Sequence, residues 1–259
     1  MAQAAAAVNR QDSRPTPRAT APALEPRQSA NDPAIGRVDL YKGVHKGLRE
    51  FMSDVLSAVG RLDAYDPAEV AATVEQVRGL LDACRFHLHK ENQFLHPAME
   101  ARRPGSASPI AAEHVHHEEA IERLAADILA VERSTGEARA AAALTLYRRL
   151  ALFVAENLEH MHVEETENNA VLWAAYTDEE LREIEQMLLA SVPPQWLAVF
   201  LRWMVPAMSP AERAGLMTGI QSGAPAEVFR GILAMVKPHL GERDWAKLMA
   251  AIAPLPMGG

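Results

Sequence analysis

Cysteine is almost missing from this sequence, because Cys84 is the only one among its 259 residues. One thiol excludes a disulfide framework, and it also excludes a structural zinc site closed by several cysteines. No apolar run approaches the roughly 20 residues that a membrane-spanning helix needs. The first eight residues lack the basic and apolar segments of a signal peptide. We therefore expect a cytoplasmic protein with no membrane partner.

Positive charge is also scarce, since the formal net charge is −8. We therefore expect no nucleic-acid partner, because phosphates call for a basic face on the protein. Aromatic residues make up only 5%, whereas hydrophobic residues together make up 49% and charged residues 23%. Alanine and leucine dominate, so strong helix formers outweigh β-branched and aromatic residues. The composition predicts a globular all-α fold.

The chain divides into three predicted parts. Residues 1–36 have few large apolar side chains, so we expect a disordered N-terminal tail. Residues 37–175 carry four helical patterns joined by short turns, which predict an up-down-up-down four-helix bundle. An N-cap at Asp66 and a capping box from Ser134 to Glu137 mark two of the helix starts. Residues 176–259 contain about five shorter helices with breaks near prolines, including Pro206, and are predicted to form a C-terminal helical subdomain or cap.

Histidine is concentrated in the bundle region, where nine of the ten lie between His45 and His162. A histidine there is a candidate metal ligand only if it points inward, and helical phase decides this. At about 100° per residue, His87 and Glu91 fall on the apolar stripe of the second helix. The fourth helix repeats this pattern one turn apart with its own histidine and glutamate. The residues on the stripe of the fourth helix are His160 and Glu164, and those off the stripes are His89, His96 and His162.

The other two helices add inward histidines. His45 lies on the stripe of the first helix, and His114 and His117 lie on that of the third, whereas His116 points away and Glu118 lies at the stripe edge. Buried imidazoles and facing carboxylates are costly unless they are paired or bound to metal. Metal ions remove this cost, and the donor set favours iron or manganese over a structural zinc. The candidate metal ligands are His45, His87, Glu91, His114, His117, His160 and Glu164.

Two segments resemble a known family. FHLHKENQFLHP at residues 86–97 and HMHVEE at residues 160–165 are similar to the second-helix and fourth-helix motifs of the hemerythrin-like HHE cation-binding family. The resemblance covers about residues 38–175. It implies a di-iron centre with Glu91 and Glu164 as bridging carboxylates. It also implies four terminal ligands, which are His45, His87, His114 and His160.

The chain departs from the oxygen-carrier pattern of that family on two helices. That pattern has two histidines four residues apart on the third helix, where position 118 is Glu in this chain. It also has an Asp five residues after the fourth-helix histidine, where this chain has Glu164 at four residues and Glu165 next. With these departures, the ligand pattern of this chain resembles that of the bacterial di-iron subgroup of the family. They leave His117 and Glu118 as rivals of His114, or additions to it, on the third helix.

The resemblance implies a cofactor of two iron ions, bridged by an oxo or hydroxo group, in preference to manganese or zinc. A site with more imidazole than carboxylate keeps coordination positions open for a small ligand. We therefore expect binding of oxygen, nitric oxide or peroxide, for sensing, scavenging or iron handling. One alternative is an enzyme that dismutates peroxide or acts as an oxidase at the same site. The other is a metal-stabilised protein-interaction module, in which Trp196, Phe200, Trp203 and Met204 form an apolar face of the C-terminal part. We expect these four residues to pack onto the bundle or line its open end rather than to bind a partner.

Overall fold

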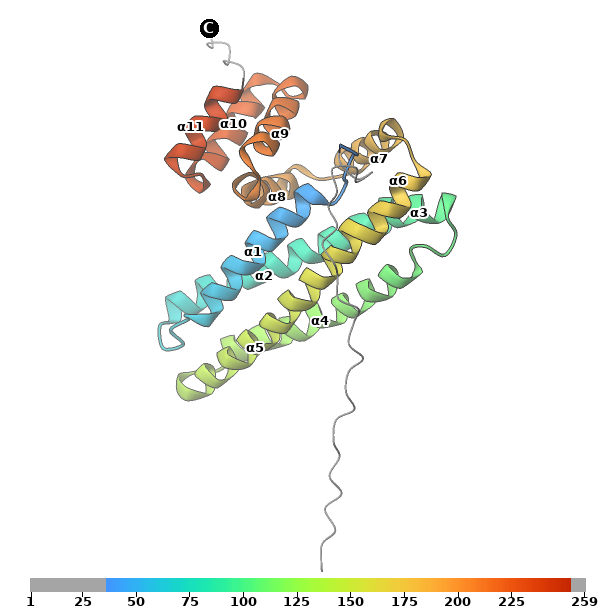
Figure 1. Ribbon diagram of the computed structural model, residues 1–259. Helices are drawn as coiled ribbons and strands as arrows, with labels where there is room; N and C mark the ends of the chain where they lie inside the picture. The colour runs from blue at the N-terminus through green and yellow to red at the C-terminus, as the bar shows by residue number, and fades with distance from the viewer. Residues whose placement is uncertain (1–35, 253–259) are drawn as a thin grey trace, which may run out of the picture. The chain divides into compact units, whose positions relative to one another are not determined.

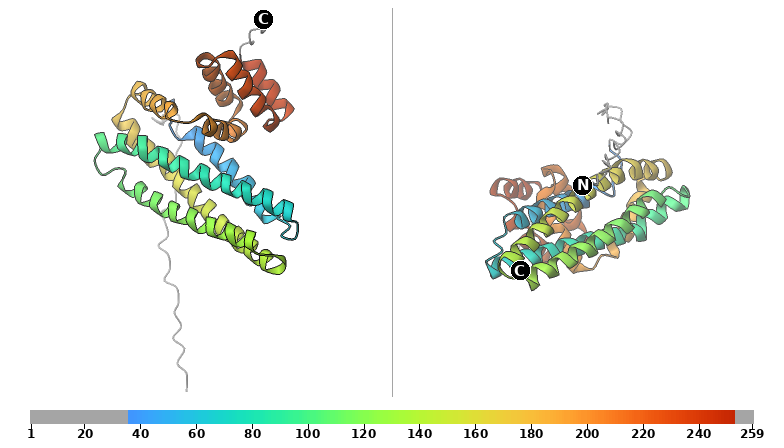
Figure 2. Two further views of the ribbon diagram at one scale, coloured as in Figure 1. Left: turned by 180° about the vertical axis from the view of Figure 1, so that it is seen from behind. Right: turned by 90° about the horizontal axis from the view of Figure 1, so that it is seen from below.

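The structure is a computed structural model that describes residues 36–252, so the predicted tail lies outside the described part except for Gly36. Four long helices form a bundle in which each helix runs antiparallel to the one before it (Figure 1). The view from behind shows α2 and α4 side by side (Figure 2). Residues 36–252 contain no strand, and the predicted all-α up-down-up-down bundle is confirmed. Its helices are α1 (Lys42–Gly60), α2 (Pro67–Lys90), α4 (Ser108–Arg133) and α5 (Gly136–Val163).

The start of α2 follows the sequence prediction. The Asp66 carboxylate accepts hydrogen bonds from the N–H groups of Ala68 at 2.8 Å and Glu69 at 3.3 Å. Pro67 occupies the first helical position, where the N–H that proline lacks has no partner in the helix. Local chemistry therefore fixes this helix end.

The predicted capping box from Ser134 to Glu137 is wrong. Thr135 precedes α5, and its side chain makes no capping hydrogen bond. The Ser134 hydroxyl instead donates to the carbonyl of Ala130 at the end of α4, at 2.7 Å. A serine between two helices can hydrogen-bond to the end of the first or to the start of the second, and Ser134 bonds to the end of α4.

A π-helical segment interrupts each of two long helices. The segment η1 (Glu91–Leu95) joins α2 to α3 (His96–Arg102), and η2 (Glu164–Asn168) joins α5 to α6 (Asn169–Ala175). Such a segment accommodates an extra residue in a helix and is frequent at functional sites. Both segments begin at a glutamate that the sequence places on the inner face. They also change the direction in which every later residue of the helix points.

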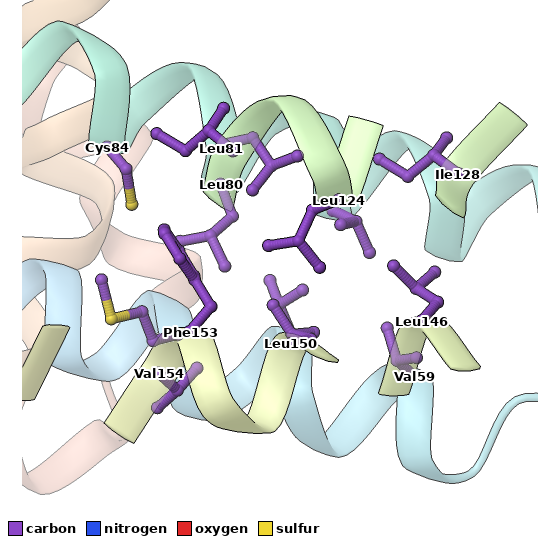
Figure 3. Close-up of a cluster of buried hydrophobic side chains, with 14 of the residues drawn as sticks. Val59, Leu80, Leu81, Cys84, Leu124, Ile128, Leu146, Leu150, Phe153 and Val154 are labelled. Atoms are coloured by element: carbon purple, nitrogen blue, oxygen red, sulfur yellow. The ribbon is translucent and has the colours of Figure 1, made fainter. Parts of the chain in front are cut away.

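Two apolar clusters fill the bundle. The larger one, the bundle core, lies along α1, α2, α4 and α5 and includes Leu80, Leu124, Leu150 and Phe153 (Figure 3). The smaller one, the end cluster, lies where α3, α6 and α7 (Asp178–Ala190) close one end of the bundle. It includes Tyr41, Leu95, Met99, Ile110, Leu172, Leu181 and Ile184.

Five α-helices follow Thr177 within the described residues, as the sequence predicts. Pro206 is not a break, because it lies inside α8, only one residue before the helix ends at Ala207. A proline so close to the end removes a hydrogen bond only from the last turn. The helices after α7 are α8 (Pro194–Ala207), α9 (Pro210–Gly223), α10 (Ala226–Val236) and α11 (Glu242–Ala251), with the short 3-10 helix η3 (Lys237–His239) before α11.

The C-terminal helices pack on the bundle through α8. Trp196, Phe200 and Trp203 of α8 contact the bundle core, and the Trp203 ring stacks on Phe51 of α1 with centroids 4.1 Å apart. The opposite side of α8 joins α9, α10 and α11 in a third cluster around Phe229. The division of the chain at residues 175 and 176 stays a prediction.

No individual helix in residues 36–252 combines the length and the apolar character that crossing a membrane requires. The pair α7 and α8 meets these criteria only when the two are taken together, and it is bent by 118°.

Candidate metal centre

Six of the predicted ligands meet in one polar layer between the two apolar clusters. On α4, His114 lies between Ile110 of the end cluster and Ile121 of the bundle core. On α1, the histidine of the site follows Tyr41 of the end cluster and precedes Leu48 of the bundle core. Apolar side chains therefore cover the layer on both sides. The six residues, all buried, are His45, His87, Glu91, His114, His160 and Glu164.

The six side chains form two groups that share both carboxylates. Within each group, one donor atom from every residue lies within 4.8 Å of the others. Two histidines complete each group, so the donors are distributed evenly. The first group adds His45 and His87 to Glu91 and Glu164, and the second adds His114 and His160 to the same two glutamates.

Each glutamate turns one oxygen toward each group. Oε1 of Glu91 is 3.2 Å from Nε2 of His87, whereas its Oε2 is 3.6 Å from Nε2 of His114. Oε2 of Glu164 is 3.3 Å from Nε2 of His45, whereas its Oε1 is 3.4 Å from Nε2 of His160. Donors about 2.1 Å from one ion and at right angles to each other lie about 3 Å apart. The distances therefore suit two ions bridged by two carboxylates.

The donor atoms themselves show that the residues fit such ions. Nε2 of all four histidines and both oxygens of both glutamates are buried without a hydrogen-bond partner. A buried polar atom that lacks a partner costs about 1–3 kcal/mol. These eight atoms lie together and all carry lone pairs, so they need a shared electron-pair acceptor, which a metal ion provides. Two cations fit this set, because nitrogen and oxygen donors suit iron. Cys84 is not in either group, and burial raises the pKa of its thiol to about 12.

The pKa values of the two glutamates shift in opposite directions. Burial and the neighbouring Glu164 raise the pKa of Glu91. Burial acts in the same direction on Glu164, but the imidazoles of His114 and His160 close to its oxygens hold the pKa of Glu164 well below its usual range. Burial lowers the pKa of His160, but Glu164 and Glu113 outweigh it and raise that pKa to about 9. Cations between the carboxylates would relieve the repulsion that raises the pKa of Glu91.

Outer hydrogen bonds orient three of the four histidines. Each donates its Nδ1–H to an oxygen on a neighbouring side chain, which fixes the tautomer and leaves the lone pair of Nε2 directed into the site. The Arg49 guanidinium in turn holds Glu165, the partner of His45, through bonds of 2.6 and 3.0 Å. The three bonds are His45 to Glu165 at 3.1 Å, His114 to Asn92 at 2.9 Å and His160 to Glu113 at 2.8 Å.

His117 is buried but lies outside the two groups. It forms a separate group with Glu113 and His160. The Asn157 amide donates to the Phe153 carbonyl at 2.8 Å and approaches Nδ1 of His117 at 3.2 Å with the same nitrogen. Nδ1 of His117 is therefore an acceptor, and its Nε2 carries the hydrogen when the ring is neutral. This is the opposite tautomer to that of the three oriented histidines.

The remaining histidines between His45 and His162 divide into three exposed ones and one buried one. His89, His116 and His162 are exposed, as their helical phase predicts, and so is Glu118, the rival ligand on the third helix. Helical phase places His96 off the apolar stripe, either at the surface or behind the ligands, and the structure has it behind the ligands, because it is only 6% exposed and its ring lies against His114. The segment η1 lies between His87 and His96 and turns the later residues inward.

The sequence did not single out Asn92 and Glu113 as partners of the histidines. The signal available for them is adjacency, since Asn92 directly follows Glu91 and Glu113 directly precedes His114. A residue next to a ligand in sequence lies about 100° around the helix from it. Its side chain can therefore reach the Nδ1 atom of a ligand histidine on the adjacent helix. Which adjacent residue does so depends on how the helices pack.

The comparisons with known proteins agree with this geometry. Residues 37–171 match the model of the hemerythrin HHE cation-binding domain. This span contains all six residues of the polar layer. Comparison with the curated proteins and with the solved structures gave no significant match.

Proposed function

Because the chain belongs to the hemerythrin HHE cation-binding family, we propose that it is a non-haem di-iron protein that binds oxygen, nitric oxide or peroxide. Its role is sensing, scavenging or iron handling. Each of the two groups of the polar layer would hold one iron, and Glu91 and Glu164 belong to both groups. The proposed terminal ligands are His45, His87, His114 and His160.

One observation carries this proposal. Each shared carboxylate presents one oxygen to each histidine pair, at 3.2 to 3.6 Å from the nearest imidazole nitrogens of that pair. A mononuclear site needs no such division of oxygens, and a hydrogen-bonded core would pair these atoms with one another. Two irons held in this way supply Lewis acidity and redox chemistry to a small molecule that reaches them.

The chain's own residues orient the ligands and keep water out. Glu113, Asn92 and Glu165 hold three imidazoles through Nδ1, so the Nε2 lone pairs need no reorganisation when metal binds. The bundle core and the end cluster cover the layer with apolar side chains, and Tyr41 of the end cluster is fully buried. Apolar side chains on both sides of the site exclude bulk water, which strengthens the electrostatic interactions of whatever small ligand enters.

Anaerobic reconstitution with ferrous iron tests the metal content directly. We expect two irons per chain and an optical change when oxygen, nitric oxide or peroxide is added. Protein without bound iron, or loaded protein whose spectrum responds to none of these ligands, would contradict the proposal. Repeated turnovers with hydrogen peroxide that Glu164→Ala abolishes would favour the enzyme alternative.

A matched pair of variants on one helix tests the ligand assignment. His87→Ala removes a donor of the first group, so we expect it to bind fewer than two irons. His89→Ala, two residues away and exposed, should keep both, because helical phase turns it away from the site. Iron per chain and far-ultraviolet circular dichroism decide the outcome. Equal iron in two folded variants would be incompatible with the assignment.

A further inference from the structure

His96 stands at a position that a regular helix would turn outward. It follows His87 by nine residues, so at about 100° per residue the two should point in nearly opposite directions. The π-helical segment η1 intervenes and changes the phase. As a result, His96 and His87 are both buried.

The second π-helical segment repeats this arrangement. Asn169 follows Glu164 by five residues, as His96 follows Glu91, and each is the first residue after its π segment. Both side chains are buried and both contain an atom without a hydrogen-bond partner, Nε2 of His96 and Oδ1 of Asn169. The Asn169 side chain is in part accounted for, because its amide nitrogen donates to the Glu165 carbonyl at 3.1 Å. Nε2 of His96 makes no hydrogen bond to the protein. The two halves of the site thus turn a polar side chain inward in the same way.

His96 lies beside the metal ligands without being one of them. Its ring centroid is 4.6 Å from that of His114, at an interplanar angle of 34°. No nitrogen of His96 belongs to either group of the polar layer. An unpaired imidazole nitrogen costs about 1–3 kcal/mol when it is buried, and a phenyl ring would fill the same space without that cost. The nitrogen therefore needs a partner at the site other than the protein.

We propose that Nε2 of His96 donates a hydrogen bond to the small ligand that the centre takes up, next to His114. The preferred ligand is then an anion or a strongly polar species with a hydrogen-bond acceptor, such as peroxide, rather than an apolar diatomic molecule. This inference rests on the proposed function, because it assigns a subsite of the same centre. It makes His96 a ligand-binding residue and leaves the metal ligands unchanged.

Azide binding to the iron-loaded, oxidised full-length protein tests the proposal, because azide is a small anion whose binding can be followed by absorbance. His96→Phe keeps the ring and removes the donor, whereas His96→Gln keeps a donor at a similar reach. Loss of one hydrogen bond to a charged group corresponds to a rise in Kd of about tenfold or more. We expect this rise in His96→Phe, recovery of most of the affinity in His96→Gln, and two irons per chain in both. His89→Phe, on the exposed face of α2 before η1, should bind azide like the wild type.

Each contrary result has a distinct meaning. Wild-type azide affinity in an iron-loaded His96→Phe protein would overturn the inference and leave the di-iron proposal intact. Loss of iron from His96→Phe would make His96 a metal ligand, which also overturns the inference. Equal weakening in His96→Phe and His96→Gln would show that the ring only fills space. A wild-type protein that binds two irons but no azide would contradict the subsite, whereas one that binds no iron would contradict the proposed function itself.

Discussion

Gly47 on α1 is a position where the fold leaves no room for a methyl group. A Cβ atom placed there would lie 2.7 Å from Cγ of Met204 and 3.0 and 3.1 Å from its backbone N and Cα. Backbone atoms cannot turn aside as a side-chain end can, so α8 would have to move away from α1. Overpacking of this kind costs about 1–3 kcal/mol, whereas replacing glycine in a helix returns about 0.5–1 kcal/mol. We expect Gly47→Ala to lower the free energy of unfolding by about 1–2 kcal/mol.

Two other glycines provide matched controls for helix propensity. A Cβ at Gly43, also on α1, would lie 3.3 Å from the methyl ends of Met204 and Met208, which can shift. A Cβ at Gly219 of α9 would have nothing within 4 Å. Gly43→Ala should therefore change stability little, and Gly219→Ala should raise it by up to about 1 kcal/mol.

Urea unfolding followed by circular dichroism measures these differences, and tryptophan fluorescence reports the interface because Trp203 stacks on Phe51. A loss of 1 kcal/mol corresponds to a fall in Tm of about 2–4 °C in a chain of this size. His45 lies between Gly43 and Gly47, so displacement of α8 also bears on the metal site. If Gly47→Ala were as stable as Gly219→Ala with unchanged fluorescence, the close packing of α8 on α1 would be refuted.

Two further predictions concern ion pairs. Partial burial raises the pKa of Glu212, but Lys42 and Lys46 outweigh it and hold that pKa below its usual range. A carboxyl group with a lowered folded-state pKa stabilises the fold above its unfolded pKa of about 4.3. Glu212→Gln should thus cost about 1 kcal/mol at pH 7 in low salt. The difference in urea midpoint from wild type should shrink as the pH falls from 5 to 3, and a constant difference would contradict the ion-pair account. Glu165→Gln leaves an acceptor for His45 but removes the charge, so iron affinity in a chelator competition should fall by about tenfold. Equal affinities of this variant and the exposed control Glu167→Gln would exclude an electrostatic role.

Much of the polar layer follows from helical phase alone. His87 and Glu91 fall on one face because they are four residues apart, and the same spacing places His160 beside Glu164. Phase also turns His89 and His162 to the surface, where the structure has them. These predictions depend only on the rotation per residue within one uninterrupted helix. Such a property is local, so it can be obtained from the sequence.

Phase within one helix does not choose between His114 and His117. The two are three residues apart, both are buried, and both face the interior of the bundle. The choice is made by Asn92 on η1 and Asn157 on α5, which impose opposite tautomers on the two rings. Those contacts join residues 22 and 40 positions apart in sequence. These contacts form only when the helices are packed in one particular axial alignment.

The sequence by itself determined the all-α bundle, the cap at Asp66 and the pairs of histidine and glutamate, because each rests on spacing within one helix. The tertiary structure alone decided that Glu91 and Glu164 each present an oxygen to both histidine pairs. It also decided that His96 is buried, since the phase change at η1 is not visible in a regular 3.6-residue pattern. The physical reason is that spacing gives the direction of a side chain only while the helix stays regular, whereas its partner is set by the packing of distant helices.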